Sequence, residues 1–255
     1  MNMRTITFNE LRKIKDSLPS GSMHRIADEL GLNVDTVRNF FGGHNFKEGK
    51  SVGIHLEPGP DGGLVMIDDT TVLERALKIL DEMGFKYIRM YDPISYAEMT
   101  CQVIRDLGLD MKVMLGPDLI SEVNNPGCPW LKETYTDEEL VNRAKRNDNN
   151  IEKLIEIANN YSDVINAVSV GNENTPKWGA NNVPVERLIE FADRLREGTG
   201  KPVTFNEGAF EWVELEELAK HLDIISVHSY PLWYGNTVEE ALEVNKTWYN
   251  QGNVS

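Results

Sequence analysis

Apolar residues follow two different arrangements along the chain, and the change falls near residue 70. Before it, short stretches of helical period are separated by Gly-containing turns, and a hairpin pattern follows them. From residue 70 onward, amphipathic helical stretches alternate with short runs rich in Val, Ile, Met and Phe. This alternation predicts a parallel sheet with helices packed outside it. The sequence therefore predicts two domains, residues 1–69 and 70–255.

The first fifty residues predict three short helices. Apolar positions recur at helical spacing over residues 8–18, 22–30 and 33–41. The last two resemble the helix-turn-helix of bacterial transcription regulators, with Ala27, Gly31 and Val37 at its small, turn and core positions. The resemblance implies that the third helix enters the major groove of duplex DNA. The candidate DNA contacts are Thr36, Arg38, Asn39 and His44, with Asp35 and Lys47 beside them. The alternative is a helical pair that packs against something other than DNA.

A β-hairpin is predicted next. Two β-rich runs, Val52–Leu56 and Leu64–Ile67, flank the Pro- and Gly-rich residues 58–63. Pro and Gly at these positions are typical of a hairpin turn. The hairpin would form a wing beside the helix-turn-helix, and the whole segment to residue 69 then resembles small DNA-binding proteins of some bacteria.

Five strands, each followed by a helix, are predicted in the second domain. The predicted strands are residues 85–93, 110–116, 163–174, 201–208 and 223–233. The predicted helices are residues 72–84 (capped by Thr70 or Thr71), 96–107, 150–160, 185–197, 213–221 and 238–248, with a long loop at 117–130. Polar side chains follow several strands, at the edge that carries the chemistry in a (β/α)8 barrel.

The segment 168–174, VSVGNEN, carries the sharpest chemical signal. A buried apolar strand ends at Gly171 and presents Asn172 and Glu173 at its tip. A carboxyl group there can act as a general acid toward a glycosidic oxygen if its pKa is raised, and an adjacent amide can bind the neighbouring sugar hydroxyl. The alternative is a helix-capping Asn followed by a solvated Glu.

The order of these strands and their tips resembles glycoside hydrolase family 17, the (β/α)8 enzymes that include β-1,3-glucanases. The resemblance covers residues 72–250 and implies that Glu173 is the acid/base residue and that β-glucan or an oligosaccharide is the ligand. It implies that the other strand-end residues bind sugar: Asn172, Arg89, Tyr91, Asp92, Glu207, His228, Tyr230 and Trp233. Trp130 and Trp178 join Trp233 as candidate stacking surfaces, the alternative for each being an ordinary core position.

The predicted strands match strands two to six of that family, so the expected fold is an incomplete (β/α)8 TIM-type barrel. The first strand is expected to be absent or replaced by Leu64–Ile67, and no segment matches the strand that carries the nucleophile. Glu207 is the one strand-end substitute. A retaining hydrolase needs two carboxylates about 5–5.5 Å apart. We therefore expect poor hydrolysis and a small pKa shift at Glu173 in this chain, with a raised pKa only in a closed barrel.

An open five-stranded sheet also exposes its edges, which predicts self-association. Three interpretations stay open: a truncated or mis-joined gene product, a half barrel completed by another chain, or a natural fusion whose sugar-binding part no longer catalyses.

Charge and composition narrow the functional classes. The chain has 26 Lys and Arg against 41 Asp and Glu, a net charge of −15, but residues 1–50 carry eight basic and six acidic side chains. An acidic body repels phosphate backbones, so only residues 1–50 are expected to bind duplex DNA. The sequence has two cysteines, and it shows neither a long apolar run nor a secretory signal. These features predict a cytoplasmic protein without a membrane partner. The family that it resembles is, however, usually secreted or periplasmic. No motif implies a metal or a cofactor.

Three functions follow from these patterns. The first is a family 17-like glycosidase that acts on β-1,3-glucan through Glu173. The second is a DNA-binding regulator with a vestigial or sugar-sensing C-terminal domain. The third is a carbohydrate-binding fragment without catalysis.

Overall fold

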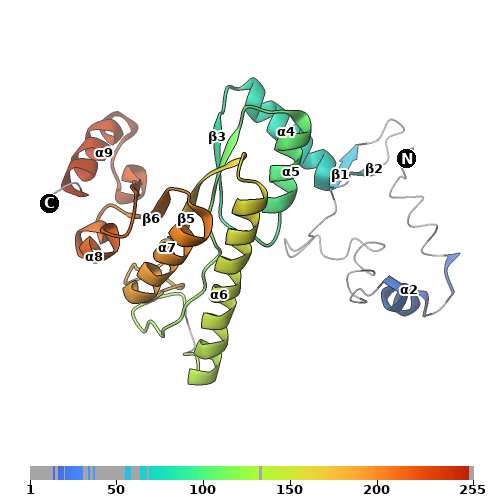
Figure 1. The fold of residues 1–255 in the computed structure, drawn as a ribbon, viewed down its shortest axis with the longest axis horizontal. Coiled ribbons are helices and arrows are strands. Elements are labelled where there is room, and N and C mark those ends of the chain that lie inside the picture. The colour runs from blue at the N-terminus through green and yellow to red at the C-terminus, as the bar shows by residue number, and fades with distance from the viewer. Residues whose placement is uncertain are drawn as a thin grey trace. The chain divides into compact units, whose positions relative to one another are not determined.

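The structure, a computed structural model, describes residues 14, 17–19, 21–30, 34, 37, 55–58, 64–67, 69–131 and 134–252. The chain divides into two compact units, residues 1–80 and 81–255 (Figure 1). This division falls inside helix α4 (Asp69–Glu82), whereas the sequence predicted a boundary just before that helix. The two threonines expected to cap α4 lie within its first turn instead.

In the first unit, helix α2 (Ser22–Leu30) confirms the second of the three predicted helices. Ser22 begins the helix, and its hydroxyl donates to the carbonyl oxygen of Pro19 at 2.7 Å. Ala27 and Val37 are buried. The four candidate DNA contacts, Thr36, Arg38, Asn39 and His44, lie outside the described residues. Binding of DNA through this segment therefore stays a prediction.

The predicted hairpin is present. Strands β1 (His55–Pro58) and β2 (Leu64–Ile67) pair antiparallel, with His55 opposite Ile67. They form a two-stranded sheet of their own, separate from the sheet of the second unit. The expectation that Leu64–Ile67 replaces the first strand of the barrel is therefore wrong, because that strand would have to run parallel beside the next one.

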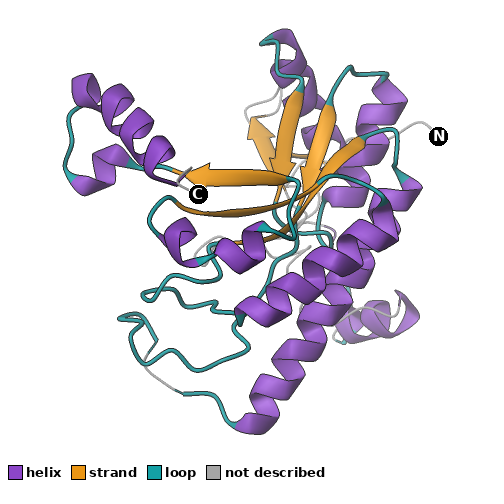
Figure 2. Cartoon of the chain, turned by 60° about the vertical axis from the view of Figure 1, so that its left-hand side comes forward, coloured by secondary structure: helices purple, strands orange, loops and turns teal. Residues whose placement is uncertain are grey.

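The second unit contains a five-stranded sheet in which all neighbours run parallel. Its strands are β3 (Tyr87–Met90), β4 (Lys112–Leu115), β5 (Ile165–Asn172), β6 (Val203–Gly208) and β7 (Ile224–His228). Their order in space is their order in the chain, β3-β4-β5-β6-β7. A helix separates each pair of strands, and Figure 2 shows helices packed along the sheet. This is the predicted architecture of an incomplete TIM-type barrel.

Helices α5 (Ala97–Leu107), α7 (Val185–Thr199) and α9 (Val238–Gly252) lie close to their predicted ranges. Helix α6 (Asp137–Asn160) is much longer than the predicted 150–160. A capping box starts it, in which the Glu139 amide donates to Thr136 and the Thr136 amide donates back to the Glu139 carboxylate. Its added half contacts the preceding loop through buried Asn147, which hydrogen-bonds both the amide and the carbonyl of Ile120. Apolar periodicity does not reveal such polar packing.

The predicted helix 213–221 is also wrong. The structure has a 3₁₀ turn, η2 (Glu211–Glu214), and one helical turn, α8 (Glu216–Ala219), with a break at Leu215. Trp212 and Leu215 are both buried, and the Trp212 indole donates to the carbonyl of Ser226 in β7 at 3.1 Å. These anchors hold the segment against the sheet and prevent a continuous helix.

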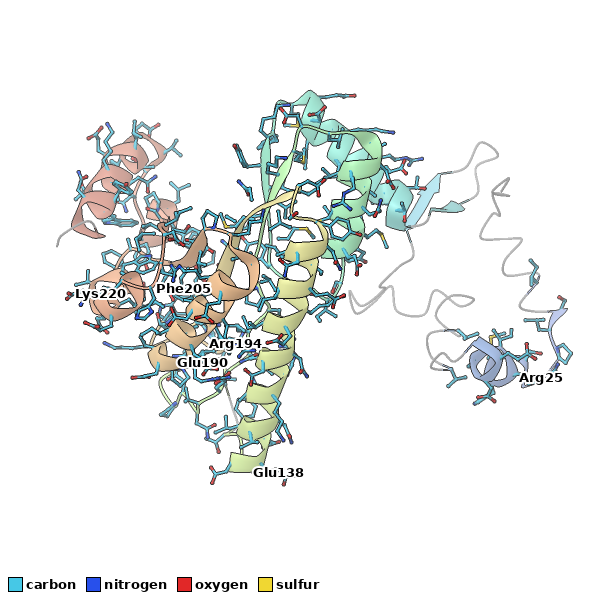
Figure 3. The ribbon with its side chains drawn as sticks, viewed as in Figure 1. Arg25, Glu138, Glu190, Arg194, Phe205 and Lys220 are labelled. Carbon is cyan, nitrogen blue, oxygen red and sulfur yellow. The ribbon has the colours of Figure 1, made fainter. Side chains whose placement is uncertain are left out.

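The core of this unit lies between the central strands and helices α6 and α7. Phe205 on β6 is fully buried, as are Leu154 and Phe191 on the two helices. Outside this layer, Arg194 on α7 forms ion pairs with Asp148 and Glu152 on α6 (Figure 3). Apolar packing and ion pairs therefore hold α6 and α7 together against the central strands.

The two edge strands of this sheet are less covered. Tyr87 on β3 is 67% exposed, and Ile224 on β7 is 43% exposed. Within the described sheet, each edge strand pairs on one side only. Such edges invite pairing, and self-association through them stays a prediction. Among the described helices, none combines the length and apolar character that a membrane span requires.

Candidate active site

The tip of β5 is held in an unusual backbone conformation. Glu173 has a φ of 49°, which residues other than glycine rarely adopt. Its amide donates to the carbonyl of Asn206 on β6 at 2.9 Å. The side chain of Asn174 folds back and accepts from the Asn172 amide at 2.8 Å. Gly171 leaves room for the Asn174 side chain, because a Cβ at position 171 would overlap Asn174 Oδ1.

Side chains from three strands meet at this tip. Nδ1 of His228 lies 2.7 Å from Glu173 Oε1, and the Tyr230 hydroxyl donates to the same oxygen at 3.3 Å. On its other side, Nε2 of His228 lies 3.2 Å from a guanidinium nitrogen of Arg89. A guanidinium only donates, so Nε2 accepts, and Nδ1 carries the proton that His228 gives to Glu173. Arg89 also donates to Asn172 Oδ1 at 2.8 Å.

This network requires a strongly curled sheet. Arg89 lies on β3 and His228 on β7, which are the two edges of the described sheet. Four strand spacings of about 4.8 Å would separate flat edges by roughly 19 Å. Their side chains nevertheless meet at 3.2 Å on the concave side. The curl therefore brings the predicted strand-end residues together, and the alternative of a solvated Glu173 is excluded.

The pKa of Glu173 is lowered, chiefly by the hydrogen bond from His228, which outweighs the opposing effect of burial. Tyr230 and the positive charge of Arg89 act in the same direction. A general acid in a closed barrel is expected to have a raised pKa, whereas the pKa of Glu173 in this half barrel is lowered. In this arrangement Glu173 is an ionised hydrogen-bond acceptor at neutral pH.

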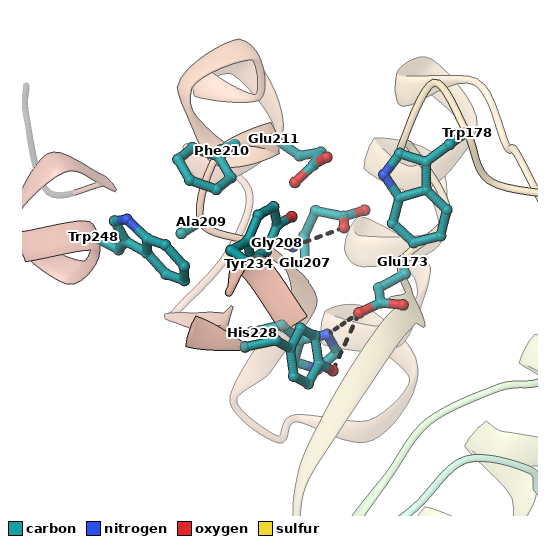
Figure 4. Close-up of a pocket in the computed structure, with 11 residues that line it drawn as sticks. Glu173, Trp178, Glu207, Gly208, Ala209, Phe210, Glu211, His228, Tyr234 and Trp248 are labelled. Carbon is teal, nitrogen blue, oxygen red and sulfur yellow. Dashed lines mark hydrogen bonds and ion pairs between the residues drawn. The ribbon is translucent and has the colours of Figure 1, made fainter. Parts of the chain in front are cut away.

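A cavity adjoins this network (Figure 4). Its lining residues are Glu173, Trp178, Glu207, Gly208, Ala209, Phe210, Glu211, His228, Tyr230, Tyr234 and Trp248. Six of these were missed by the sequence reasoning: Gly208, Ala209, Phe210, Glu211, Tyr234 and Trp248. Gly208 ends β6 and the next three residues follow it, so a wider window after each strand would have found these four. The rings of Phe210, Tyr234 and Trp248 pack edge to face around one another, with centroids 5.2–5.7 Å apart.

Glu207 lies in this cavity wall with none of its surface exposed. Its Oε2 accepts from the Thr175 hydroxyl at 2.8 Å and from the Thr175 amide at 3.2 Å, and its Oε1 accepts from the Gly208 amide at 2.8 Å. Burial raises the pKa of Glu207 to about 7 in spite of these three donors. The carboxyl group is therefore engaged by the protein itself, and direct contact with sugar stays a prediction.

Two other predicted residues lie nearby in different roles. The guanidinium of Arg89 stacks over the Tyr91 ring, 4.2 Å from its centroid. Asp92 accepts from the Ile94 amide at 2.8 Å and from the Ser95 hydroxyl at 2.6 Å, so it organises the turn before α5. No cluster of His, Cys, Asp or Glu in the described part of the chain is arranged to hold a metal ion.

The three candidate tryptophans are all exposed. Trp130 is 68%, Trp178 48% and Trp233 89% exposed, so the core alternative is wrong for each. Trp178 lines the cavity beside Glu173, whereas Trp130 and Trp233 are not among the lining residues. Trp178 is therefore the tryptophan best placed to contact a ligand in this cavity.

Comparisons with known proteins identify the fold. No family model matches the sequence, and no curated protein matches it. Solved structures do match. A glycoside hydrolase family 17 β-1,3-glucanosyltransferase from Rhizomucor miehei has a TM-score of 0.54 at 19% identity, over 72% of this chain and 60% of that one. An active-site mutant of that protein, solved in complex with laminaritriose, matches with the same values.

A Lactobacillus rhamnosus β-glucuronidase has a TM-score of 0.50 at 14% identity, over 78% of this chain and 35% of that one. At these identities the likeness shows a shared fold, the (β/α)8 type, and no more. The chain covers about three fifths of the length of the Rhizomucor miehei protein.

Proposed function

We propose that residues 81–252 bind β-1,3-linked glucan in a site of the glycoside hydrolase type, with Glu173 as its acid/base residue. The observation that carries this proposal is the network in which Arg89, Asn172, Glu173, His228 and Tyr230 converge at the C-terminal edge of the sheet. The family 17 fold supports it, as does the laminaritriose complex of the Rhizomucor miehei protein.

The chemistry of such a site follows from its hydrogen bonds. An ionised Glu173 can accept a hydrogen bond from a hydroxyl group of a bound sugar, and Asn172 presents an amide next to it. To donate a proton to a glycosidic oxygen, Glu173 must first be protonated, and its lowered pKa makes that form scarce at neutral pH. Proton donation should therefore increase as the solution becomes more acidic.

Hydrolysis is proposed to be slow. A retaining mechanism needs a second, ionised carboxylate within reach of the anomeric carbon. Glu207 lines the same cavity, but it is fully buried and accepts three hydrogen bonds from the protein. Glu211 also lines the cavity, and its carboxylate packs against Gly208. Oligosaccharide binding is thus the principal activity proposed.

Calorimetric titration with laminaritriose tests the binding proposal. We expect saturable binding that is weaker for cellotriose, whose β-1,4 linkages present different hydroxyls. Glu173→Gln keeps the shape of the side chain but removes its charge, so it should weaken binding. Equal affinity for both trisaccharides would reject the β-1,3 preference, and no binding of either would reject the sugar site.

Reducing-end release from laminarin tests the proposed slow turnover. We expect little product from the wild-type chain and none from Glu173→Gln. Robust turnover by the wild-type chain that is lost in Glu173→Gln would reject the proposed slow hydrolysis.

A second proposed function is weak binding of duplex DNA by residues 1–50. Helix α2 and the burial of Ala27 and Val37 agree with a helix-turn-helix core. Mobility-shift titration of the full chain should give a complex that weakens as salt rises, because phosphate contacts release counterions. Arg38→Ala should reduce sequence preference. No complex at low salt and high micromolar protein would reject this function.

A further inference from the structure

Strand β6 contacts the loop after β5 at two successive residues. The carbonyl of Asn206 accepts from the Glu173 amide at 2.9 Å. The carboxyl group of Glu207 accepts from both the amide and the hydroxyl of Thr175, two residues after Glu173. The backbone between these two contacts contains Glu173 and Asn174.

That stretch of backbone needs such support. Glu173 has a positive φ, and a residue with a side chain holds that conformation only where its surroundings enforce it. Asn174 is buried and bridges the amide of Asn172 to the carbonyl of Asn181. Among the described side chains of β6, Glu207 is the one that hydrogen-bonds to the residue after Asn174, which is Thr175.

We propose that Glu207 is a positioning residue, which holds Thr175 and thereby directs the carboxylate of Glu173 toward His228. This inference rests on the acid/base role proposed for Glu173. It gives Glu207 a function distinct from sugar contact and from nucleophilic attack.

The geometry of Glu207 favours this role over both alternatives. A nucleophile or a sugar ligand needs a free oxygen that solvent or substrate can reach, but Glu207 is fully buried. Oε2 already has two donors and Oε1 has one. An isolated carboxyl group is costly to bury, so the donors from Thr175 and Gly208 make its position specific.

Thr175 offers a matched pair of variants for the test. Thr175→Ser keeps the hydroxyl that donates to Glu207, whereas Thr175→Val has nearly the same shape and removes it. Glu207→Gln is the third variant, since its amide group would face the Thr175 or Gly208 donors. The first measurement is the Nδ1–H resonance of His228 by nitrogen-edited NMR, which reports the hydrogen bond to Glu173 in the absence of any ligand.

We expect Thr175→Ser to keep the wild-type His228 resonance, and Thr175→Val and Glu207→Gln to shift or broaden it. Laminaritriose affinity, the second measurement, should fall by about 10- to 100-fold in the same two variants, as is typical when a supporting residue is lost.

The positioning role is overturned if Thr175→Val and Glu207→Gln melt at a lower temperature but keep both the His228 resonance and the wild-type affinity. It is also overturned if Thr175→Ser behaves like Thr175→Val, because the hydroxyl would then be irrelevant. Failure of the wild-type chain to bind laminaritriose would reject the proposed function instead, and the NMR comparison would still decide the role of Glu207.

Discussion

Arg89 and His228 lie on opposite edges of the described sheet and touch across its concave side, with 3.2 Å between a guanidinium nitrogen and Nε2. This one contact has two effects. It fixes the tautomer of His228, so that the imidazole donates to Glu173. It also connects the two edge strands, so that the geometry of the site depends on the curl of the sheet.

Removing the imidazole should raise the pKa of Glu173. His228→Ala deletes the hydrogen bond that is the largest cause of the lowered value. A carboxyl group with a lowered folded-state pKa stabilises the fold above its unfolded pKa and loses that contribution as the pH falls through the folded pKa. His228→Ala should therefore weaken the dependence of stability on pH in the acid range. Carboxyl carbon NMR titration measures the pKa, and urea unfolding at several pH values measures the stability.

His221→Ala is the matched control for this change. His221 forms a comparable contact with Asp193, 2.9 Å long, and neither residue lines the cavity. It should leave the pKa of Glu173 unchanged. An unchanged Glu173 pKa in His228→Ala would show that this hydrogen bond does not lower it, and a fall would contradict the assigned direction of the hydrogen bond.

Glu207 should make the protein less stable as the pH rises from about 4.5 to 7. Its folded-state pKa of about 7 lies above the ordinary value of 4.5, so the folded state binds the extra proton in this range. The free energy of unfolding should then fall by about 1.4 kcal/mol per pH unit, or about 3 kcal/mol in all. Urea unfolding of the wild type and Glu207→Gln measures this contribution. The variant should have a flatter profile, whereas Glu214→Gln, at an exposed surface pair, should keep the wild-type slope.

Trp178→Ala should weaken laminaritriose binding more than Trp130→Ala does. Both side chains are exposed, but only Trp178 lines the cavity beside Glu173. Loss of its ring should cost about 1 kcal/mol, or roughly fivefold in affinity, because an aromatic face packs on the apolar face of a sugar. Calorimetric titration measures both variants. An equal loss in the two would place the sugar outside this cavity.

Gly171→Ala should destabilise the fold by about 1–3 kcal/mol, because the new methyl group would overlap Asn174 Oδ1. The cost should shrink when Asn174→Ala is added, since that change removes the obstructing atom. Thermal unfolding of the two single variants and the double variant gives the coupling. If the destabilisations of the two single variants simply add in the double variant, the Asn174 side chain does not limit the space at Gly171.

The sequence predicted the architecture because the second unit follows a simple rule. Apolar runs become buried parallel strands, and polar residues after β3, β5 and β7 gather at one edge. The sequence therefore predicts that Arg89, Asn172, Glu173 and His228 lie at the same edge. It does not predict their hydrogen-bonded partners, because these depend on how far the sheet curls.

Other features depend on contacts between distant segments. The first half of α6 packs through Asn147, a polar residue that no apolar pattern marks. Glu207 follows Asn206 just as Glu173 follows Asn172, yet one carboxyl group is buried against Thr175 and the other faces His228. The strands differ at this point, because β5 ends at Asn172 and Glu173 has a positive φ, whereas β6 continues through Glu207 to Gly208. The two similar Asn-Glu pairs do not reveal this difference in backbone conformation.

The order of the strands in space also bears on how the protein is made. Because each strand lies beside its neighbour in the chain, every new unit leaving the ribosome can pair with the strand that has just emerged. Arg89, on the first described strand of the sheet, and Glu173, directly after the third, are then synthesised before β7. His228 arrives only with β7, so we expect a nascent chain to have a nearly complete sheet while its Glu173 carboxylate still lacks its imidazole partner.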